Sequence, residues 1–303
     1  MNHVTRSVII ANDVVGVGKV ALSSALPVLS TCQIEVIPMP TVLLSSHTGG
    51  FDKIAITDLT QATKGFINQW ETLDFPCHGL ITGYFKNQTQ LKELAKFASK
   101  HKLSRFVDPI MADKGNLYAG YDQDFVLAMR EFCKNANVIT PNLTEACLLA
   151  DCPYLGETYT KTDIEQLCER LSHLHNKHII LTGVSFEADN VGLAHYDSES
   201  GEITYHFSKA YPYHFFGTGD LVTAVLGAGY FHDLSLDDVA KVALNFIDKT
   251  LQRTLSLKRD LRFGLSYEPY LPDLALQIKQ LMEEKVLKIL PHVNLLNLVF
   301  IQH

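Results

Sequence analysis

Short β-branched runs alternate with longer segments of helical periodicity along most of this chain, and this alternation constrains the fold more than any other feature. It is the pattern of parallel strands joined by crossover helices, so we expect an α/β fold with a doubly wound sheet. The expected strands are residues 7–11, 34–39, 79–82, 105–107, 138–140 and 178–181. The expected helices are residues 88–101, 122–135, 163–176, 218–230 and 236–254.

Two further runs, residues 192–196 and 203–208, alternate around the turn-like segment 197–201. They predict a hairpin that extends the sheet in antiparallel fashion. Because no linker, repeat or low-complexity segment is visible, we expect one continuous domain over residues 1–257, with a C-terminal region, 258–303, packed on it. Polar residues interrupt the apolar stretch 286–301, which is too short to span a membrane and is interpreted as a docking tail.

Composition excludes some classes of partner and location. The net charge of −7 argues against nucleic-acid binding, which depends on clustered lysine and arginine. The six cysteines contain no C-x-x-C pair, which favours a reduced, cytoplasmic protein. Only Arg6 precedes the first apolar run, and that run is too short for a secretory signal, so no export and no membrane partner are expected.

The strongest chemical signal is Gly217-Thr218-Gly219-Asp220, just before a helix of small residues. Glycines at a helix start let backbone N–H groups approach an anion, and the helix dipole favours negative charge there. An acid at the end of that turn can take the proton from a hydroxyl group that attacks a phosphorus atom. The alternative is a plain capping turn with an acid in its first helical turn.

A second signal is the segment 140–145, in which Pro141 helps to start a helix. Asn142 and Glu145 lie three residues apart, hence on one helix face, and can hold the water shell of a Mg²⁺ ion bound to nucleotide phosphates. An ordinary first-turn acid is the alternative. The loop from Asp108 to Gly115 carries two acids, Asp108 and Asp113, and solvated turn acids are the alternative there.

One apparent phosphate loop is rejected. Gly18-Lys19 follows the first strand, but Asp13 stands where the motif requires glycine and Val20 stands where it requires serine or threonine. The histidines and cysteines have no spacing typical of a zinc site.

In this order, over residues 5–255, the segments resemble the vitamin B6 kinase branch of the ribokinase-like superfamily. Six segments carry the resemblance: Asn12-Asp13, Leu44 to Gly50, Thr82-Gly83-Tyr84, Asp108 to Asp113, Thr140 to Glu145, and Gly217 to Asp220. The resemblance implies a mostly parallel sheet flanked by helices, use of ATP with Mg²⁺ and a monovalent cation (K⁺ or Na⁺), and a homodimer. It also implies phosphorylation of the 5′-hydroxymethyl group of pyridoxal, pyridoxine or pyridoxamine.

The resemblance also implies roles for individual residues. Asp220 would be the base, with the anion hole formed by Gly217, Thr218 and Gly219. The remaining assignments are the nucleotide phosphates (Asp108, Asp113, Thr140, Thr182), the metal-bound water (Asn142, Glu145) and the pyridine ring (Asp13, Thr48, Tyr84). The chain departs from the branch at Val15-Gly16, where Ser-Cys is usual, and at Ala112, where glycine is usual.

Two alternatives stay open. One is a hydroxymethylpyrimidine kinase of the same fold, whose substrate also presents a hydroxymethyl group to an aspartate. The other is a non-catalytic B6-binding protein that retains the fold, although such a protein would not need a proton-accepting Asp220 beside an anion hole. A sugar kinase fits less well, because no early glycine pair and acid are present to hold sugar hydroxyl groups.

Overall fold

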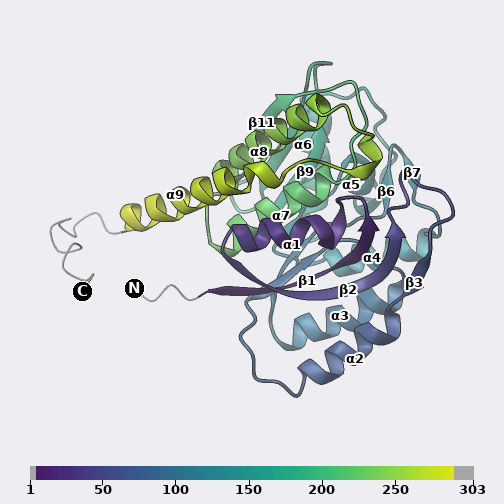
Figure 1. The fold of residues 1–303 in the computed structure, drawn as a ribbon. Helices are drawn as coiled ribbons and strands as arrows, with labels where there is room; N and C mark the ends of the chain where they lie inside the picture. Colours follow the sequence, from purple (N-terminus) through teal and green to yellow (C-terminus); the bar gives the residue numbers. More distant parts are fainter. Residues whose placement is uncertain (1–4, 290–303) are drawn as a thin grey trace.

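A nine-stranded sheet forms the centre of the structure, a computed structural model that describes residues 5–289 (Figure 1). Its strand order is β11-β10-β9-β8-β5-β4-β1-β2-β3. The strands are β1 (Arg6–Val17), β2 (Ile34–Ser46), β3 (Ile56–Asp58), β4 (Gly79–Thr82), β5 (Ser104–Val107), β8 (Val138–Ile139), β9 (His178–Val184), β10 (Asn190–Asp197) and β11 (Ile203–Lys209). Strands β6 (Ala112–Asp113) and β7 (Asn116–Leu117) pair separately.

The central strands, from β2 across to β9, pair in parallel, whereas β3, β10 and β11 pair antiparallel at the two edges. This arrangement confirms the predicted doubly wound, mostly parallel sheet with an antiparallel extension. The predicted hairpin is present as β10 and β11, with Ala194 opposite Tyr205.

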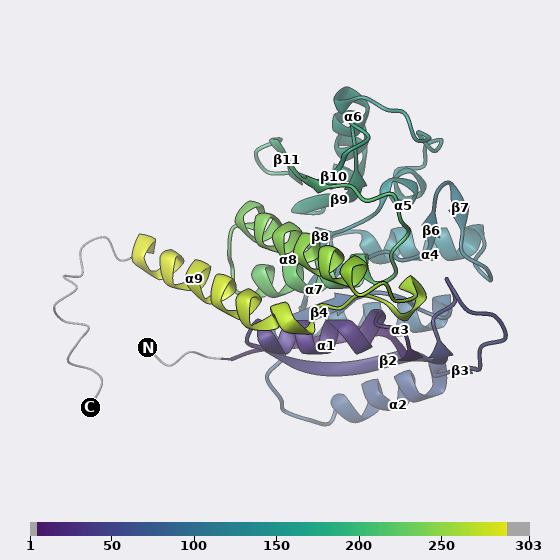
Figure 2. The same ribbon diagram turned by 45° about the horizontal axis from the view of Figure 1, so that its top comes forward.

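Helices cover both faces of the sheet and give three layers (Figures 1 and 2). One face carries α1 (Ala21–Thr31), α7 (Thr218–Phe231), α8 (Leu236–Ser256) and α9 (Leu271–Ile289). The other face carries α2 (Thr60–Trp70), α3 (Gln88–Lys100), α4 (Gln123–Cys133), α5 (Leu143–Leu149) and α6 (Lys161–Ser172). Strand β1 serves both layers, because Val8 and Ile10 enter the first core while Ile9 and Ala11 enter the second.

All the predicted strands and helices are present, but β1 runs farther than expected. It continues to Val17, since β2 also continues and pairs with it beyond a bulge between Asn12 and Val14. Asn12 and Asp13 were expected to follow the strand, and they lie inside it, at the bulge. A bulge turns side chains away from the regular alternation, and this one aims a polar pair at the carboxyl edge of the sheet.

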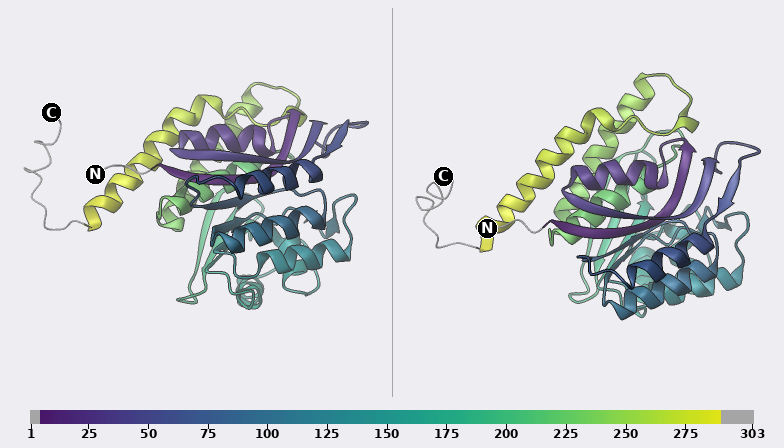
Figure 3. Two further views of the ribbon diagram at one scale, coloured as in Figure 1. Left: turned by 90° about the horizontal axis from the view of Figure 1, so that it is seen from below. Right: turned by 60° about the horizontal axis from the view of Figure 1, so that its bottom comes forward.

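Three helices have no counterpart in the prediction. Helix α1 contains Pro27 and has no side-chain cap, and α2 buries only Thr63 and Ile67. Helix α9 lies in the C-terminal region, where Leu274 and Ile278 join the core shared with α1 and α8. Figure 3 shows its far end extending past the rest of the fold.

The segment between α8 and α9 contains two short 3-10 turns, Leu261–Phe263 and Glu268–Tyr270. The predicted docking tail, 286–301, falls mostly outside the described residues. Within residues 5–289, no helix combines the length and apolar character needed to cross a membrane.

Candidate active site

The predicted site residues gather at the carboxyl edge of the central strands. Asp13 lies in β1, Tyr84 follows β4, Asp108 follows β5, Thr140 follows β8, and Thr182 lies near the end of β9. Because these five strands lie within one run of the sheet order, their carboxyl ends lie together. This edge is where ligands bind in open α/β sheets.

The start of α7 faces the same edge. Gly217 caps the helix in the left-handed conformation, with φ +89°, and a Cβ atom there would lie 2.3 Å from the carbonyl oxygen of Lys19. Only glycine fits both conditions. The N–H groups of Thr218 and Gly219 open the helix, where they have no partner within the helix, so the turn offers donors to an anion.

Asp220 occupies the first turn of α7 and contacts β1. Its Oδ1 accepts a hydrogen bond from Asn12 Nδ2 at 3.4 Å. Burial raises the pKa of Asp220, while the backbone N–H of Ala21, the amide of Asn12 and the charge of His47 lower it in part. A carboxylate whose pKa lies above its ordinary value is a better proton acceptor near neutral pH.

Three other carboxyl groups share this region, and each has a raised pKa. Burial, then the charge of Asp220, raises the pKa of Asp13 to about 7. Burial raises that of Asp108 to about 7, with Asp220 adding to the shift, although Asp108 Oδ2 accepts a hydrogen bond from Thr223 Oγ1 at 2.7 Å. Burial and the charge of Asp108 raise the pKa of Glu145. We call Asp13, Asp108, Glu145 and Asp220 the carboxylate cluster.

The carboxylate cluster forms no ion pair with a basic side chain. Within residues 5–289, none of the four forms a salt bridge with lysine, arginine or histidine, although the charge of His47 acts on Asp220. Like charges in a low-dielectric site repel one another, and a cation would relieve that repulsion. The charge of the cluster therefore suits a ligand that brings a cation.

Asn142 and Glu145 are already engaged with the backbone. Glu145 Oε1 accepts from Met111 N at 3.0 Å and its Oε2 accepts from Asn142 N at 2.9 Å, while Asn142 Oδ1 accepts from Glu145 N at 3.0 Å. This capping box starts α5. The alternative interpretation of the pair, an acid in the first turn of a helix, is therefore present, and the metal role stays a prediction.

The donor set fits Mg²⁺ held through water rather than directly. The described residues contain no group of three or more ligating side chains able to hold a metal ion. Mg²⁺ keeps several waters and usually takes one or two carboxylates together with substrate phosphates. Asp108, with one oxygen bonded to Thr223, and Glu145, bonded to three backbone N–H groups, supply negative charge for such an ion.

Two threonine hydroxyl groups at the same edge lack partners. Thr82 Oγ1 and Thr140 Oγ1 are buried and make no hydrogen bond within the described structure. Buried polar groups are almost always satisfied, so each requires a water molecule or a ligand atom. Thr140 was predicted at the nucleotide phosphates, and its free hydroxyl is compatible with that role. Thr82 was not singled out.

A cavity of about 520 Å³ lies between the β9–β11 edge of the sheet and helices α7 and α8. Thr182, Thr218 and Gly219 are among its lining residues. Apolar side chains also line it: Leu193, Val222, Leu244, Ile247 and Leu251. Its volume and mixed lining suit a ligand of nucleotide size, with phosphates toward the start of α7. Asp113 does not line this cavity, although its neighbour Lys114 does.

The ring-contact residues are only partly brought together. Asn12 Oδ1 accepts from Asp13 N at 3.0 Å and from Tyr84 N at 2.7 Å, so one side chain joins two of the three predicted residues. Thr48 lies exposed in the turn after β2. Its neighbour His47 is buried, and the charge of His47 acts on Asp220.

Asn12 and His47 interact with predicted site residues, but sequence reasoning assigned neither of them an individual role. The ring of His47 lies 4.5 Å from that of Phe216, and its Nε2 is 2.6 Å from the carbonyl oxygen of Arg262. Both residues stand in quoted motifs, next to residues that were chosen. Each could have been considered because it is a polar residue next to a predicted site residue: Asn12 precedes Asp13, and His47 precedes Thr48.

Comparison with known proteins identifies relatives over most of the chain. The sequence profile of the phosphomethylpyrimidine kinase family matches residues 34–263. A pyridoxal kinase from Arabidopsis thaliana is 26% identical over 287 residues, which cover 88% of this chain and 87% of that one. A candidate hydroxymethylpyrimidine/phosphomethylpyrimidine kinase from Schizosaccharomyces pombe is 26% identical over 225 residues. That match covers 68% of this chain and only 40% of the S. pombe protein.

Solved structures agree over the whole fold. Pyridoxal kinase from Lactobacillus plantarum superposes with a TM-score of 0.83 and 31% identity, covering 91% of this chain and 98% of that one. A candidate phosphomethylpyrimidine kinase from Bacteroides thetaiotaomicron, crystallised with pyridoxal, superposes with a TM-score of 0.84 and 28% identity. That superposition covers 89% of this chain and 96% of the other.

Proposed function

This chain belongs to the phosphomethylpyrimidine kinase family, within the ribokinase-like superfamily, and we propose that it phosphorylates the 5′-hydroxymethyl group of pyridoxal, pyridoxine or pyridoxamine. Kinases of this family use ATP, typically with Mg²⁺. The similarity to pyridoxal kinases over nearly the full length of both chains supports a B6 vitamer. The B. thetaiotaomicron protein, with its pyridoxal, supports the same substrate class in a chain named for the pyrimidine.

One observation carries the proposal. The proposed base, Asp220, is joined through a single amide, that of Asn12, to Asp13 and Tyr84, the two residues expected at the pyridine ring. A hydroxymethyl group on a flat ring held by Asp13 and Tyr84 would therefore lie beside Asp220. Positioning of this kind supplies much of the rate in phosphoryl transfer, where the protein does little covalent chemistry.

The proposed reaction uses the described groups as follows. The hydroxymethyl oxygen attacks the γ-phosphorus, its proton passes to the Asp220 carboxylate, and the bond to the β–γ bridging oxygen breaks to release ADP. The N–H groups at Gly217 to Gly219 donate to the phosphoryl oxygens as charge develops on them. Asp108 and Glu145, with Asn142, would hold the water shell of Mg²⁺, which neutralises phosphate charge when bound.

The nucleotide assignments rest on the resemblance and on the cavity beside α7. We propose that the phosphates lie near Thr140, Thr182 and Asp113, with the nucleoside in the 520 Å³ cavity. By resemblance alone, we also propose that Thr48 contacts the vitamer, that K⁺ or Na⁺ assists, and that the chain is a cytoplasmic homodimer of kinase domains (1–257) with the C-terminal region (258–303) packed on them.

A hydroxymethylpyrimidine substrate is the second candidate, since the family profile and the S. pombe relative carry that description. The same Asp220 would serve it, because that ring also bears a hydroxymethyl group. A non-catalytic B6-binding protein is disfavoured by the intact turn from Gly217 to Asp220.

A substrate panel tests the proposal. Purified protein is given ATP and Mg²⁺ with pyridoxal, pyridoxamine, hydroxymethylpyrimidine or ribose, and kcat/KM is measured for each. We expect the highest value with a B6 vitamer. A higher value with hydroxymethylpyrimidine would replace the proposed substrate while keeping the kinase.

Asp220→Asn and Asp163→Asn form a matched pair for that panel. Both aspartates are the third residue of a helix, in α7 and α6 respectively, but Asp163 caps its own helix at Thr160. Turnover should fall only in Asp220→Asn. Absence of turnover with all four acceptors in the wild type would favour the binding protein instead.

A further inference from the structure

Asn12 is the most constrained polar side chain at the site that has no assigned role. It lies at the bulge of β1 and is 4% exposed. All three of its side-chain hydrogen bonds go to residues of the proposed site or to the backbone beside them. A buried amide in this position costs free energy unless its hydrogen bonds are made, so its contacts define what it does.

The orientation of the Asn12 amide is determined by its neighbours. Oδ1 accepts from two backbone N–H groups, those of Asp13 and Tyr84, which can only donate. The NH₂ group must therefore be on the other side, where Asp220 Oδ1 can only accept while it is ionised. The polarity of the three partners leaves one arrangement of the amide.

The loop after β4 has room for the Asn12 amide only because residue 83 is glycine. A Cβ atom at Gly83 would lie 2.5 Å from the amide carbon and nitrogen of Asn12. Gly83 is held in turn by its own N–H, which donates to the carbonyl oxygen of Ala11 at 2.9 Å. Strand β1 and the loop after β4 thus enclose the amide between them.

We propose that Asn12 is a positioning residue for Asp220. It ties the carboxylate to the backbone of Asp13 and Tyr84, so the base keeps a fixed position relative to the ring-binding residues. Its NH₂ group also favours the ionised form of Asp220, whose remaining lone pairs can accept the proton of the substrate hydroxyl. This inference rests on the proposed function, because it assumes that Asp220 is the base.

The alternative is that Asn12 only joins β1 to the loop after β4. Asn12→Asp separates the two roles. Asp retains an oxygen for the N–H groups of Asp13 and Tyr84, but replaces the NH₂ donor with an oxygen facing Asp220. A like charge or a shared proton at that position raises the pKa of Asp220. A base must be deprotonated, so activity should appear only at higher pH.

The measurement is the pH profile of kcat with ATP, Mg²⁺ and pyridoxal, or with the preferred acceptor of the panel. We expect the acidic limb of Asn12→Asp to move upward by about one pH unit. Asn12→Ala removes the donor without adding charge, so its limb should move in the same direction by less. Asn245→Asp, which adds the same charge at an exposed position on α8, should leave the limb unchanged.

Thermal unfolding of each variant is recorded alongside, and Asn12→Ala carries the test if Asn12→Asp does not fold. An acidic limb and plateau kcat equal to those of the wild type in both Asn12 variants would overturn the positioning role. If Asp220→Asn is inactive in the same assay, the proposed base survives that result. If Asp220→Asn retains wild-type kcat, both the base and its positioning residue are overturned.

Discussion

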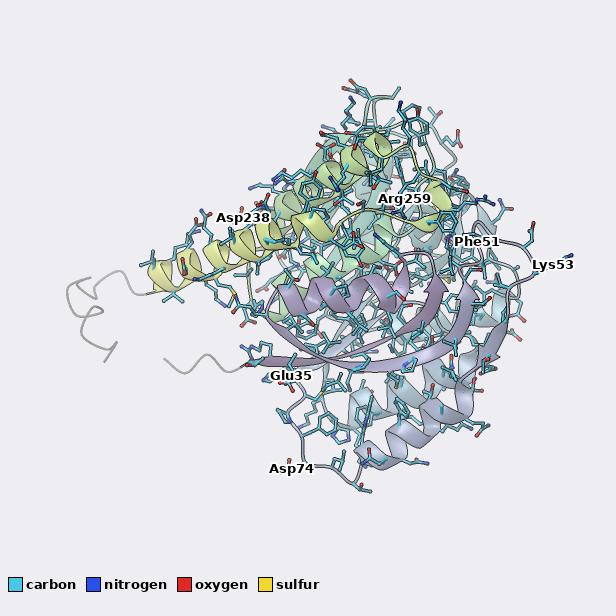
Figure 4. All side chains as sticks on the ribbon, viewed as in Figure 1. Glu35, Phe51, Lys53, Asp74, Asp238 and Arg259 are labelled. Atoms are coloured by element: carbon cyan, nitrogen blue, oxygen red, sulfur yellow. The ribbon has the colours of Figure 1, made fainter. Side chains whose placement is uncertain are left out.

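Two regions of this molecule that contain carboxylates shift the pKa values of those carboxylates in opposite directions. The carboxylate cluster lies at the carboxyl edge of the sheet, where the pKa values of Asp13 and Asp108 rise to about 7. Asp237, in the first turn of α8, lies in the second region. Figure 4 places its neighbour Asp238 on the side of Glu35, at the start of β2, and away from Phe51, which follows β2.

The second region is a histidine cluster, which we define as His178, His195, His206 and Asp237. Asp237 Oδ1 lies 3.1 Å from His195 Nδ1 and 2.7 Å from His206 Nε2, and it also accepts from the hydroxyl group of Thr204. Burial alone would raise the pKa of Asp237, but hydrogen bonds from His206, Thr204 and His195 outweigh burial and lower it to about 2.

The two regions differ in how their carboxylates are compensated. The histidine cluster joins three neighbouring strands, β9, β10 and β11, to α8, and its carboxylate is satisfied by histidine partners. Within residues 5–289, the carboxylate cluster accepts hydrogen bonds but forms no ion pair with a basic side chain, and its members raise one another's pKa values. Buried carboxyl groups with raised pKa values and no cationic partner usually mark a binding site, because a bound cation or ligand can offset their charge.

The largest expected effect is on catalysis. Asp220→Asn removes the proposed proton acceptor while keeping the shape of the side chain, so kcat should fall by about 10² to 10⁴. It also removes a buried, repelled charge, so the free energy of unfolding at pH 8 should not decrease. Steady-state kinetics and urea unfolding check the two parts. A large loss of stability would mean that Asp220 belongs with the structural network instead.

The second prediction concerns the pH dependence of stability. A carboxyl group whose pKa is higher in the folded state contributes stability below its unfolded pKa, near 3.8, and loses it as pH rises through the folded value, about 7. Asp13 should therefore destabilise the ligand-free protein as pH rises from about 4 to 7. Asp13→Asn should reduce that slope, by at most about 1.4 kcal/mol per pH unit.

Urea unfolding of the wild type and Asp13→Asn between pH 4 and 8 measures this difference, since groups that do not interact with Asp13 contribute equally to both. Identical slopes of unfolding free energy against pH would show that burial does not raise the pKa of Asp13. Saturating ATP and Mg²⁺ should flatten the wild-type curve if the ligand relieves the repulsion within the carboxylate cluster.

The third prediction concerns a carboxyl group whose pKa is lowered rather than raised, so its contribution to stability has the opposite pH dependence. The pKa of Asp237 is lowered from 3.8 to about 2, so its contribution is present above pH 3.8 and is lost as pH falls through 2. Asp237→Asn should lower the free energy of unfolding at pH 7 by about 1 to 2 kcal/mol, reduced for a side chain that is 34% exposed. Its kcat should remain that of the wild type. A kcat loss comparable to that of Asp220→Asn would contradict the separation of the two regions.

The sequence predicted one region much better than the other, for a physical reason. Acids that directly follow the predicted strands identify the carboxyl edge, and so Asp13 and Asp108 could be chosen from strand positions. Asp220 was chosen instead from the glycine turn that precedes its helix. The histidine cluster arises from cross-strand neighbours. His195 pairs opposite Thr204, and His206 lies two residues farther on, so their common partner Asp237 depends on strand register and on the packing of α8.

The same reasoning explains what was missed elsewhere. Asn12 reaches Tyr84 only because of a bulge in β1, and His47 reaches Arg262 across 215 positions of sequence. Neither contact has a periodic signal. Helix α9 was not predicted, although its apolar residues have helical spacing: Leu274 and Ile278 are buried, and Leu271, Leu281 and Met282 pack against the same core.

The smallest expected effect is that of the N-cap of α8, and it tests whether Asp237 stabilises the fold through its histidine partners or through the start of its helix. Ser235 caps α8, and its Oγ accepts from Asp238 N at 3.3 Å. Ser235→Ala should cost about 0.5 to 1 kcal/mol of unfolding free energy, toward the lower end for caps because the bond is long. That loss should be the same at pH 3 and pH 7, since no titrating group is removed, whereas the loss in Asp237→Asn should shrink at pH 3. If both losses shrink together, the contribution of Asp237 comes from the helix start rather than from its histidine partners.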